Sequence, residues 1–497
     1  MDLLHYIYVC NRLQPYKSFT QEVCACVILS TNVRCAGMGL IMVKVNVLKN
    51  GIKVVTEELS YLRTVSFGVW IQVGSAKENK ENNGISHMIE HMLFKGTKKK
   101  SAKEIADIIA SIGDDVNAFT SKEQTCYYGT TITESLPVLV ELIADMLCNS
   151  LLSEEDLRKE KRVIYEEIDM YEDSADDMVH EILQQNVFKN HPLGYIISGY
   201  KKNVRSFKRR QLIDFKEKHY VAENIVISVA GNFSENELMT QLEKCFGGIR
   251  GTSPKALNSL TLLKKKKEEL LLAPYEEKYQ KKQDEIPSYH TCFCHKHKDN
   301  EQLHINLAYP SIPLGSDESV VFAVVNSMLG GSNNSRLFQR IREELSLVYS
   351  IYSYGSSFEK AGLFHLDITV NPQQAFRVLR ETKLVMDEFL TIPITKEELD
   401  THKAQVKTEF ILGSESAKAR MNSNAKSVMI RGYVKTLDEV IEELNQLSSE
   451  DINRFANKIW GESSASLCVI GAESGVSFRA LKKEYQNLFL TSPNTKE

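Results

Sequence analysis

The chain has 497 residues, a formal net charge of −4 and a hydrophobic fraction of 42%, which together predict a globular protein of about two to four domains with a substantial core. Its short lysine runs lie beside acidic or polar residues and do not form a nucleic-acid-binding pattern, and no stretch of about 20 apolar residues is present to span a membrane. The ten cysteines are scattered rather than arranged as a disulfide framework, so we expect a reducing compartment, the cytoplasm, and neither nucleic acid nor membrane as a partner.

The segment 1–41 lacks any repeating helix or strand pattern, although it holds four of the ten cysteines. It has no basic region in front of a long apolar core, as a secretory signal would, and too little arginine for a mitochondrial presequence. A regular pattern opens only at Met42. We therefore expect 1–41 to be an atypical extension, with Met42 or Met38 as the biological start.

Hydrophobic periodicity predicts a strand over 65–73, a helix over 102–112, a strand over 127–132 and a helix over 135–149. Between the first two elements, His87, Glu90 and His91 spell H-x-x-E-H, the reverse of the zinc-peptidase motif H-E-x-x-H. On a helix the two histidines lie about 40° apart on one face, with Glu90 about 60° to the other side of His87 and apolar residues opposite. By itself the pattern leaves two interpretations open: a catalytic metal site, or paired histidines on a helix surface.

A third ligand is needed, because catalytic zinc usually takes three protein ligands and leaves one position for water. The helical segment 157–171 offers the candidate carboxylates. Glu160 and Glu167 flank its apolar stripe at about 50–70°, whereas Glu166 points to the opposite, solvent side. We therefore predict Glu167 as the third ligand and Glu160 as a neighbouring group that orients a ligand imidazole or tunes Glu90. An ordinary acid on the helix surface is the alternative for Glu160.

Two pairs of similar segments indicate that the chain is duplicated. Ser153-Glu-Glu-Asp-Leu and Thr395-Lys-Glu-Glu-Leu each precede a helix and are offset by 242 residues. Asn224-Ile-Val-Ile-Ser-Val-Ala-Gly and Ser464-Ala-Ser-Leu-Cys-Val-Ile-Gly each read as a strand before an acidic turn and a helix, with an offset of 240. Nearly equal offsets at two distant points predict two similar domains.

The second half has its own elements but no H-x-x-E-H motif: strands over 303–309 and 362–370 and a helix over 373–390. Its first strand lies in 289–297, where His290, Cys292 and Cys294 alternate onto one face; their spacing fits no zinc finger, so a second metal is the weaker alternative. Residues 250–287 are rich in lysine and glutamate and predict a long charged linker. We expect four segments: the extension 1–41, a metal-bearing domain 42–249, the linker 250–287 and a domain 288–490 without a metal site.

A further motif in the first half is His191-Pro-Leu-Gly-Tyr-Ile-Ile-Ser-Gly. It is similar to the H-P-L-G-x-x-x-x-G segment of the M16 peptidase family, the inverzincins that include pitrilysin, insulin-degrading enzyme and the mitochondrial processing peptidases. The H-x-x-E-H motif followed by Glu160 and Glu167 fits the family signature, and the length resembles the short, processing-peptidase-like subfamily. This resemblance runs over most of the chain, from about 43 to 488. It implies an α+β fold of two similar domains, each a mixed, mainly antiparallel sheet with helices on one face.

The resemblance also implies an activity, a zinc metallo-endopeptidase acting on oligopeptides or on unfolded, extended polypeptide segments. His87, His91 and Glu167 would hold Zn²⁺, and Glu90 would take a proton from the attacking water and give it to the leaving amine. The catalytic residues expected are Glu90, as the general base, and Glu160, which would orient a ligand imidazole or tune Glu90. A non-catalytic M16-like structural or partner subunit is the alternative, although such chains usually lack one or more of these residues.

The family implies substrate-binding residues in both halves. Asn117, Ala118 and Phe119 match an edge-strand segment that adds an extended peptide as a further strand, while a turn followed by a buried strand is the plain interpretation. Arg342 and Tyr349 occupy the positions of a family R-x6-Y pair that approaches the scissile peptide. Because relatives pair two such two-domain units, we expect a homodimer, or a heterodimer with a related subunit, in which Arg342 and Tyr349 complete the partner's site.

Overall fold

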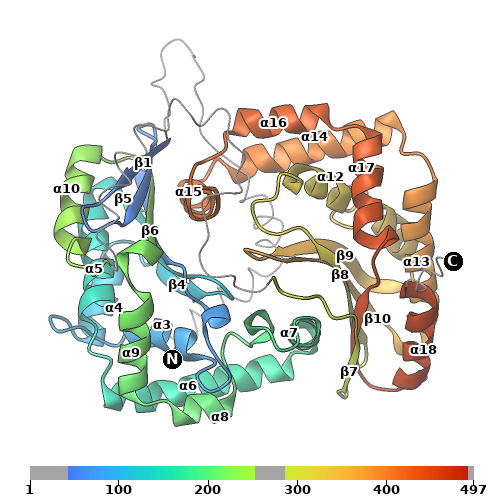
Figure 1. Ribbon diagram of the computed structural model, residues 1–497, viewed down its shortest axis with the longest axis horizontal. Helices are drawn as coiled ribbons and strands as arrows, with labels where there is room; N and C mark the ends of the chain where they lie inside the picture. Colours follow the sequence, from blue (N-terminus) through green and yellow to red (C-terminus); the bar gives the residue numbers. More distant parts are fainter. Residues whose placement is uncertain (1–42, 252–285, 491–497) are drawn as a thin grey trace.

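The computed structural model describes residues 43–251 and 286–490, so the expected extension 1–41 and nearly all of the expected linker lie outside the described residues. The first described range holds a six-stranded sheet of order β1-β2-β6-β3-β5-β4, and the second a five-stranded sheet of order β7-β11-β8-β10-β9 (Figure 1). Neighbouring strands are antiparallel except for the pairs β2–β6 and β7–β11, which are parallel. These two mixed, mainly antiparallel sheets confirm the predicted α+β class with two domains.

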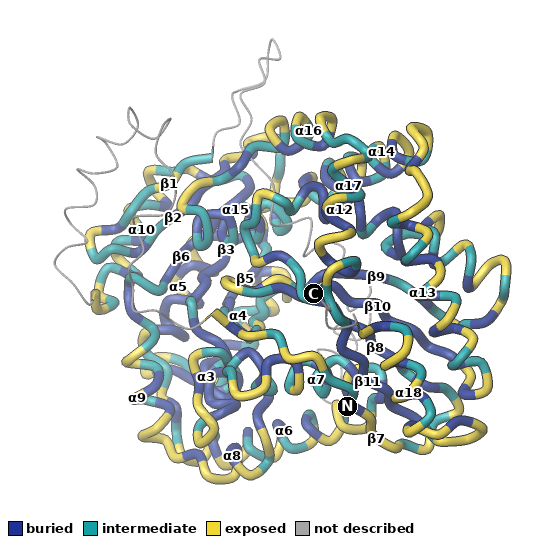
Figure 2. The backbone as a smooth tube through the Cα atoms, turned by 45° about the vertical axis from the view of Figure 1, so that its right-hand side comes forward, coloured by how far each residue is buried: buried dark blue, intermediate teal, exposed yellow. Residues whose placement is uncertain are grey.

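The strands are β1 (Val43–Val47), β2 (Lys53–Glu58), β3 (Thr64–Ile71), β4 (Val116–Thr120), β5 (Thr125–Ile132), β6 (Ile225–Gly231), β7 (Phe293–His297), β8 (Leu303–Ser311), β9 (Val348–Ser357), β10 (Gly362–Val370) and β11 (Ser466–Gly471). The strand expected over 362–370 is β10 with the same bounds, and those expected over 65–73, 127–132 and 303–309 are β3, β5 and β8 with slightly shifted ends. Figure 2 shows the sheets as largely buried, with the exposed residues on the outer helices and loops.

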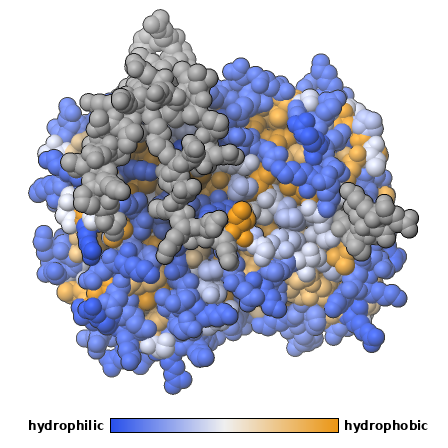
Figure 3. All heavy atoms as spheres, in the orientation of Figure 1, coloured by the Kyte–Doolittle hydropathy of each residue, from blue (hydrophilic) through white to orange (hydrophobic). Residues whose placement is uncertain are grey.

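The helices of the first half are α3 (Ile85–Leu93), α4 (Ala102–Ser111), α5 (Leu136–Asn149), α6 (Glu154–Asp173), α7 (Ala175–Val187), α8 (Lys201–Ser206), α9 (Arg209–His219) and α10 (Glu235–Phe246). Those of the second half are α12 (Ser319–Leu329), α13 (Ala375–Thr391), α14 (Lys396–Gly413), α15 (Ala417–Arg431), α16 (Leu437–Gln446), α17 (Ser449–Ala456) and α18 (Phe478–Phe489), with a π-helical segment η7 at Phe338–Glu344. Within the described residues no helix is both long and apolar enough to cross a membrane. Hydrophilic side chains dominate the face drawn in Figure 3, and the apolar ones form small patches.

The internal repeat seen in the sequence corresponds to equivalent elements of the two halves. Ser153 caps the N-terminus of α6 by accepting a hydrogen bond from the Asp156 N–H, and Thr395 caps α14 through the Glu398 N–H in the same way. The strands β6 and β11 sit inside their sheets and are each followed by a helix, α10 and α18. The two halves are therefore built on one plan.

One helix of each half covers the sheet of the other half. The helix α7, which follows α6, packs on β11, β8 and β7, and its equivalent α15, which follows α14, packs on β6, β3 and β2. Both helices lie between the two halves in Figure 1. Each sheet is thus covered on one face by helices of its own half and on the other by a helix of its neighbour. This exchange joins the halves through two buried interfaces.

Candidate active site and metal centre

The helix that carries the H-x-x-E-H motif begins at a tightly packed position. The Glu78 carboxylate accepts hydrogen bonds from the N–H groups of Gly84 (2.7 Å) and Ser86 (2.8 Å), which places a negative charge at the N-terminus of α3. Gly84 has a φ of +97°, and a Cβ there would lie 2.8 Å from the Cα of Gly199. Gly199 ends the H-P-L-G-x-x-x-x-G segment, so that segment fixes the start of the motif helix.

The three predicted ligands meet between α3 and α6. Nε2 of His87 lies 3.6 Å from Oε1 of Glu167, and Nε2 of His91 lies 3.6 Å from Oε2 of the same carboxylate. One ligand atom from each residue falls within 4.8 Å of the others. Zinc ligand atoms at 2.0–2.2 Å in a tetrahedral arrangement are separated by roughly 3.4 Å, so the spacing and the N, N, O donor set both fit zinc.

The charges at this site favour a bound cation. Burial, with a further contribution from the neighbouring His91, holds the pKa of His87 well below its usual value, so its imidazole is neutral and can act as a ligand. Burial also raises the pKa of Glu167, because a carboxylate shielded from water lacks compensation for its charge. A divalent ion between these groups would supply that compensation.

Glu160 is placed behind His91 rather than on the helix surface. It is 4% exposed, with Oε2 3.3 Å from Nδ1 of His91 and Oε1 2.9 Å from the Lys95 ammonium. Burial alone would raise the pKa of Glu160, but the hydrogen bonds from His91 and Lys95 outweigh it and hold this pKa below its usual value. The neighbouring Glu166 is exposed, as helical phasing predicts.

Glu90 lies beside the ligands without joining them, and its partner was not foreseen from the sequence. The Thr120 hydroxyl, at the end of β4, donates a 2.5 Å hydrogen bond to Oε2 of Glu90. Burial raises the pKa of Glu90, while His91 and the Thr120 hydrogen bond oppose that rise. Strand alternation puts Thr120 on the same side of β4 as Ala118, but nothing in the sequence indicates that this side faces Glu90.

The three predicted peptide-binding residues lie on β4, at the open edge of the first sheet. β4 is the last strand in the sheet order and pairs with β5 alone among the described strands. Asn117 and Ala118 are half-buried and Phe119 is 37% exposed. The same strand therefore carries the open edge and the hydroxyl that contacts Glu90.

The predicted pair in the second half is not part of this cluster. Arg342 lies in η7 with its guanidinium 4.8 Å from the centre of the Phe338 ring, and Tyr349 is the second residue of the edge strand β9 with 73% of its surface exposed. Within the described part of the chain, neither side chain forms a hydrogen bond or ion pair with His87, His91 or Glu167.

A second group of possible ligands joins α7 to β10: Asp176, His180 and Asp367. Here Nε2 of His180 lies 3.0 Å from Oδ2 of Asp367, a direct hydrogen-bond distance that is shorter than the roughly 3.4 Å between zinc ligand atoms. Tyr354 also contacts the imidazole, at 2.7 Å from its Nδ1. We interpret this group as a hydrogen-bonded network between the halves.

The His290, Cys292 and Cys294 group, which the sequence left as a weaker metal candidate, forms no such cluster in the described ranges. Nε2 of His290 hydrogen-bonds the Ser288 hydroxyl. The thiol of Cys292, just before β7, lies 3.6 Å from the thiol of Cys294 on β7.

Comparison with known proteins agrees with this geometry. Residues 53–201 match the family described as insulinase, peptidase family M16, and residues 206–406 match the peptidase M16 inactive domain. The chain is 38% identical over 421 residues to an uncharacterized zinc protease of Bacillus subtilis, covering 85% of this chain and 96% of that one. It is 32% identical over 440 residues to an uncharacterized zinc protease of Streptomyces coelicolor, covering 87% and 90%. The crystal structure of a protease from Helicobacter pylori has the same fold, with a TM-score of 0.74 at 22% identity over 87% of this chain and 100% of that one.

Proposed function

This chain belongs to peptidase family M16 and to the zinc-protease class of its relatives, and on that premise we propose that it is an endopeptidase that hydrolyses oligopeptides and extended or unfolded polypeptide segments. The observation that carries the proposal is the meeting of His87, His91 and Glu167 around one point, with Glu90 beside them.

The proposed chemistry assigns one role to each side chain. Zinc held by the three ligands would act as a Lewis acid on the scissile carbonyl and lower the pKa of water. Glu90 takes a proton from the attacking water and returns it to the leaving amine, and its raised pKa suits both transfers. The Thr120 hydroxyl donates to Oε2 of Glu90, so Oε1 would be the oxygen that takes the proton.

The open edge of β4 supports the choice of extended peptides as substrates. A peptide that pairs with β4 gains main-chain hydrogen bonds, and Asn117, Ala118 and Phe119 would contact it. Thr120 follows directly on the same strand and contacts Glu90, so a bound peptide would run alongside the proposed general base. A compact folded protein could not supply a free strand at this edge.

The exposed positions of Arg342 and Tyr349 in the second half support a role in substrate binding across a subunit interface. We propose that they stabilise the developing oxyanion of a partner's site in a homodimer; a heterodimer with a related chain is the alternative. Mixing Glu90→Gln and Arg342→Met proteins tests this directly. If Arg342 acts in trans, the mixture regains up to about a quarter of wild-type activity by random assortment; a mixture as inactive as its components contradicts it.

The non-catalytic alternative is not favoured, because all three ligand residues and Glu90 are present and assembled and the relatives are named as zinc proteases. The decisive experiment measures cleavage of a fluorogenic peptide together with zinc content. We expect chelator to abolish cleavage and Glu90→Gln to keep zinc while reducing kcat by about 10²–10⁴-fold. The control is Glu166→Gln, an exposed acid on α6. Full activity in Glu90→Gln would refute the assignment of the base.

A further inference from the structure

The Glu160 carboxylate contacts two side chains, one with each oxygen: Lys95 and the proposed metal ligand His91. Oε1 is 2.9 Å from Nζ of Lys95, and Oε2 is 3.3 Å from Nδ1 of His91. The opposite nitrogen of His91, Nε2, faces Glu167. An ammonium group, a carboxylate and an imidazole therefore form a chain that ends at the metal centre.

Lys95 is the fixed positive charge beside this buried acid. The Glu160 side chain is 6% exposed, and an isolated carboxylate in such a place is costly. Among the described residues, Lys95 is the one lysine or arginine within ion-pair distance of Glu160. His91 must be neutral when it binds a metal, so it cannot provide that charge at the same time.

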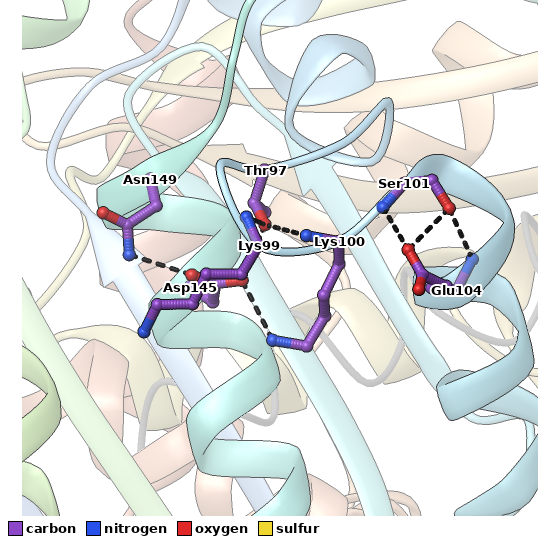
Figure 4. A network of polar contacts seen from close by, with 7 residues as sticks. All are labelled: Thr97, Lys99, Lys100, Ser101, Glu104, Asp145 and Asn149. Atoms are coloured by element: carbon purple, nitrogen blue, oxygen red, sulfur yellow. Dashed lines mark hydrogen bonds and ion pairs between the residues drawn. The ribbon is translucent and has the colours of Figure 1, made fainter.

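The backbone that follows Lys95 is held by a network of hydrogen bonds around Thr97, Lys100 and Asp145 (Figure 4). Thr97 is 4% exposed and donates a 2.7 Å hydrogen bond to Oδ2 of Asp145, and Lys100 lies 3.0 Å from the same oxygen. The Gly96 carbonyl accepts a hydrogen bond from the Leu151 N–H at 3.1 Å. Because Glu160 is buried, its ion pair with Lys95 is also screened less by water and salt than an exposed pair.

We infer that Lys95 is a positioning residue for the metal centre: it holds Glu160 in the one orientation that accepts the Nδ1–H of His91 and so presents Nε2 to the metal. A carboxylate behind a ligand histidine fixes its tautomer and ring orientation. This inference rests on the proposed function, because it assumes that His91 binds zinc. The sequence signature contains Glu160 but does not indicate which residue orients it.

The competing explanation is that Lys95 only ties α3 to α6 and supports the fold. The two explanations predict different effects when Lys95 is replaced by a neutral side chain. Loss of a purely structural tie lowers the melting temperature of the metal-free protein and leaves the affinity of a folded site for zinc unaltered. Loss of a positioning residue lowers zinc affinity in a protein that is still folded.

The experiment measures the zinc Kd of the full chain by competition with a chromophoric chelator, beside the melting temperature in EDTA. We expect Lys95→Met to raise the zinc Kd by about 10–100-fold, as for other partners of metal ligands, and Lys95→Arg to stay within about threefold of wild type. Lys103→Met is the matched control, because Lys103 is 84% exposed and pairs with Asp107 on the surface of α4.

A double-mutant cycle shows whether Lys95 acts through Glu160. We expect Glu160→Gln to weaken zinc binding similarly and the Lys95→Met/Glu160→Gln double variant to bind no more than about threefold more weakly than Glu160→Gln alone. Unchanged affinity in Lys95→Met, equal losses in Lys95→Met and Lys95→Arg, or additive losses in the cycle would each overturn the inference. Failure of the proposed function is a distinct result: wild type would then bind no zinc, or would bind zinc without cleaving the fluorogenic peptide.

Discussion

The exchange of helices between the halves makes a prediction about Arg420. This arginine on α15 forms an ion pair with Glu57 on β2, a residue with 0% exposure in the first half. Asn424, one turn further along α15, donates a 2.8 Å hydrogen bond to the other oxygen of Glu57. Arg420→Met removes the positive charge and leaves the Glu57 carboxylate buried, with the Asn424 amide as its hydrogen-bond donor on α15.

The expected cost follows from the burial of both groups. Removing one partner of a buried ion pair costs about 3–5 kcal/mol, because the remaining charge lacks compensation. The Arg420 side chain is 11% exposed, so water reaches part of it and the lower end applies. In a domain of about 200 residues, 1 kcal/mol shifts Tm by about 2–4 °C, so 3 kcal/mol predicts a fall of about 6–12 °C.

The assay is thermal unfolding of the full chain by calorimetry, with two companion variants. The Glu57→Gln/Arg420→Met double variant should recover most of the lost Tm, since no unpaired charge remains in the interface. Arg454→Met is the control, because Arg454 is 75% exposed and pairs with Asp451 on the surface of α17. The reasoning would be refuted if Arg420→Met lowered Tm no more than Arg454→Met does, or if the double variant recovered none of the lost Tm.

Three other predictions concern the metal, the base and the contact between the halves. Glu167→Gln should lower zinc content, measured by elemental analysis, while Glu166→Gln keeps wild-type content because that side chain faces solvent; equal contents would contradict the ligand assignment. Thr120→Val should lower kcat by about 10–100-fold at unchanged zinc content, since a hydrogen bond to a charged group contributes about 1.5–3 kcal/mol; an unchanged kcat would argue against its role. Burial disfavours the charged imidazole of His180, but the charge and hydrogen bond of Asp367 outweigh this and raise its pKa. The stability that charged His180 adds to the folded state is complete below its unfolded-state pKa of about 6.5 and is lost as pH rises through the higher folded-state pKa. The Tm deficit of His180→Gln relative to wild type should therefore shrink from about pH 6 to about pH 9. A deficit that does not change with pH would show that the charge is not involved.

The motif helix and the choice of its third ligand could be predicted because both depend on local geometry. Side chains four apart on a helix share a face, so His87 and His91 had to point the same way once α3 formed. The same periodicity separated Glu167 from Glu166, and the structure turns the first toward the histidines and leaves the second exposed.

The sequence by itself determined the duplication and the residues that could bind a metal, because periodicity and motif spacing are properties of neighbouring residues. The α+β class was what the resemblance of its motifs to the M16 family implied. Tertiary structure alone decided that Thr120 reaches Glu90, that Lys95 reaches Glu160, and that α7 and α15 each cover the sheet of the other half. The physical reason is that these contacts join segments whose separation along the chain fixes nothing about their distance in space. A lysine after a helix or a threonine at a strand end looks the same in sequence whether it faces water or a buried carboxylate.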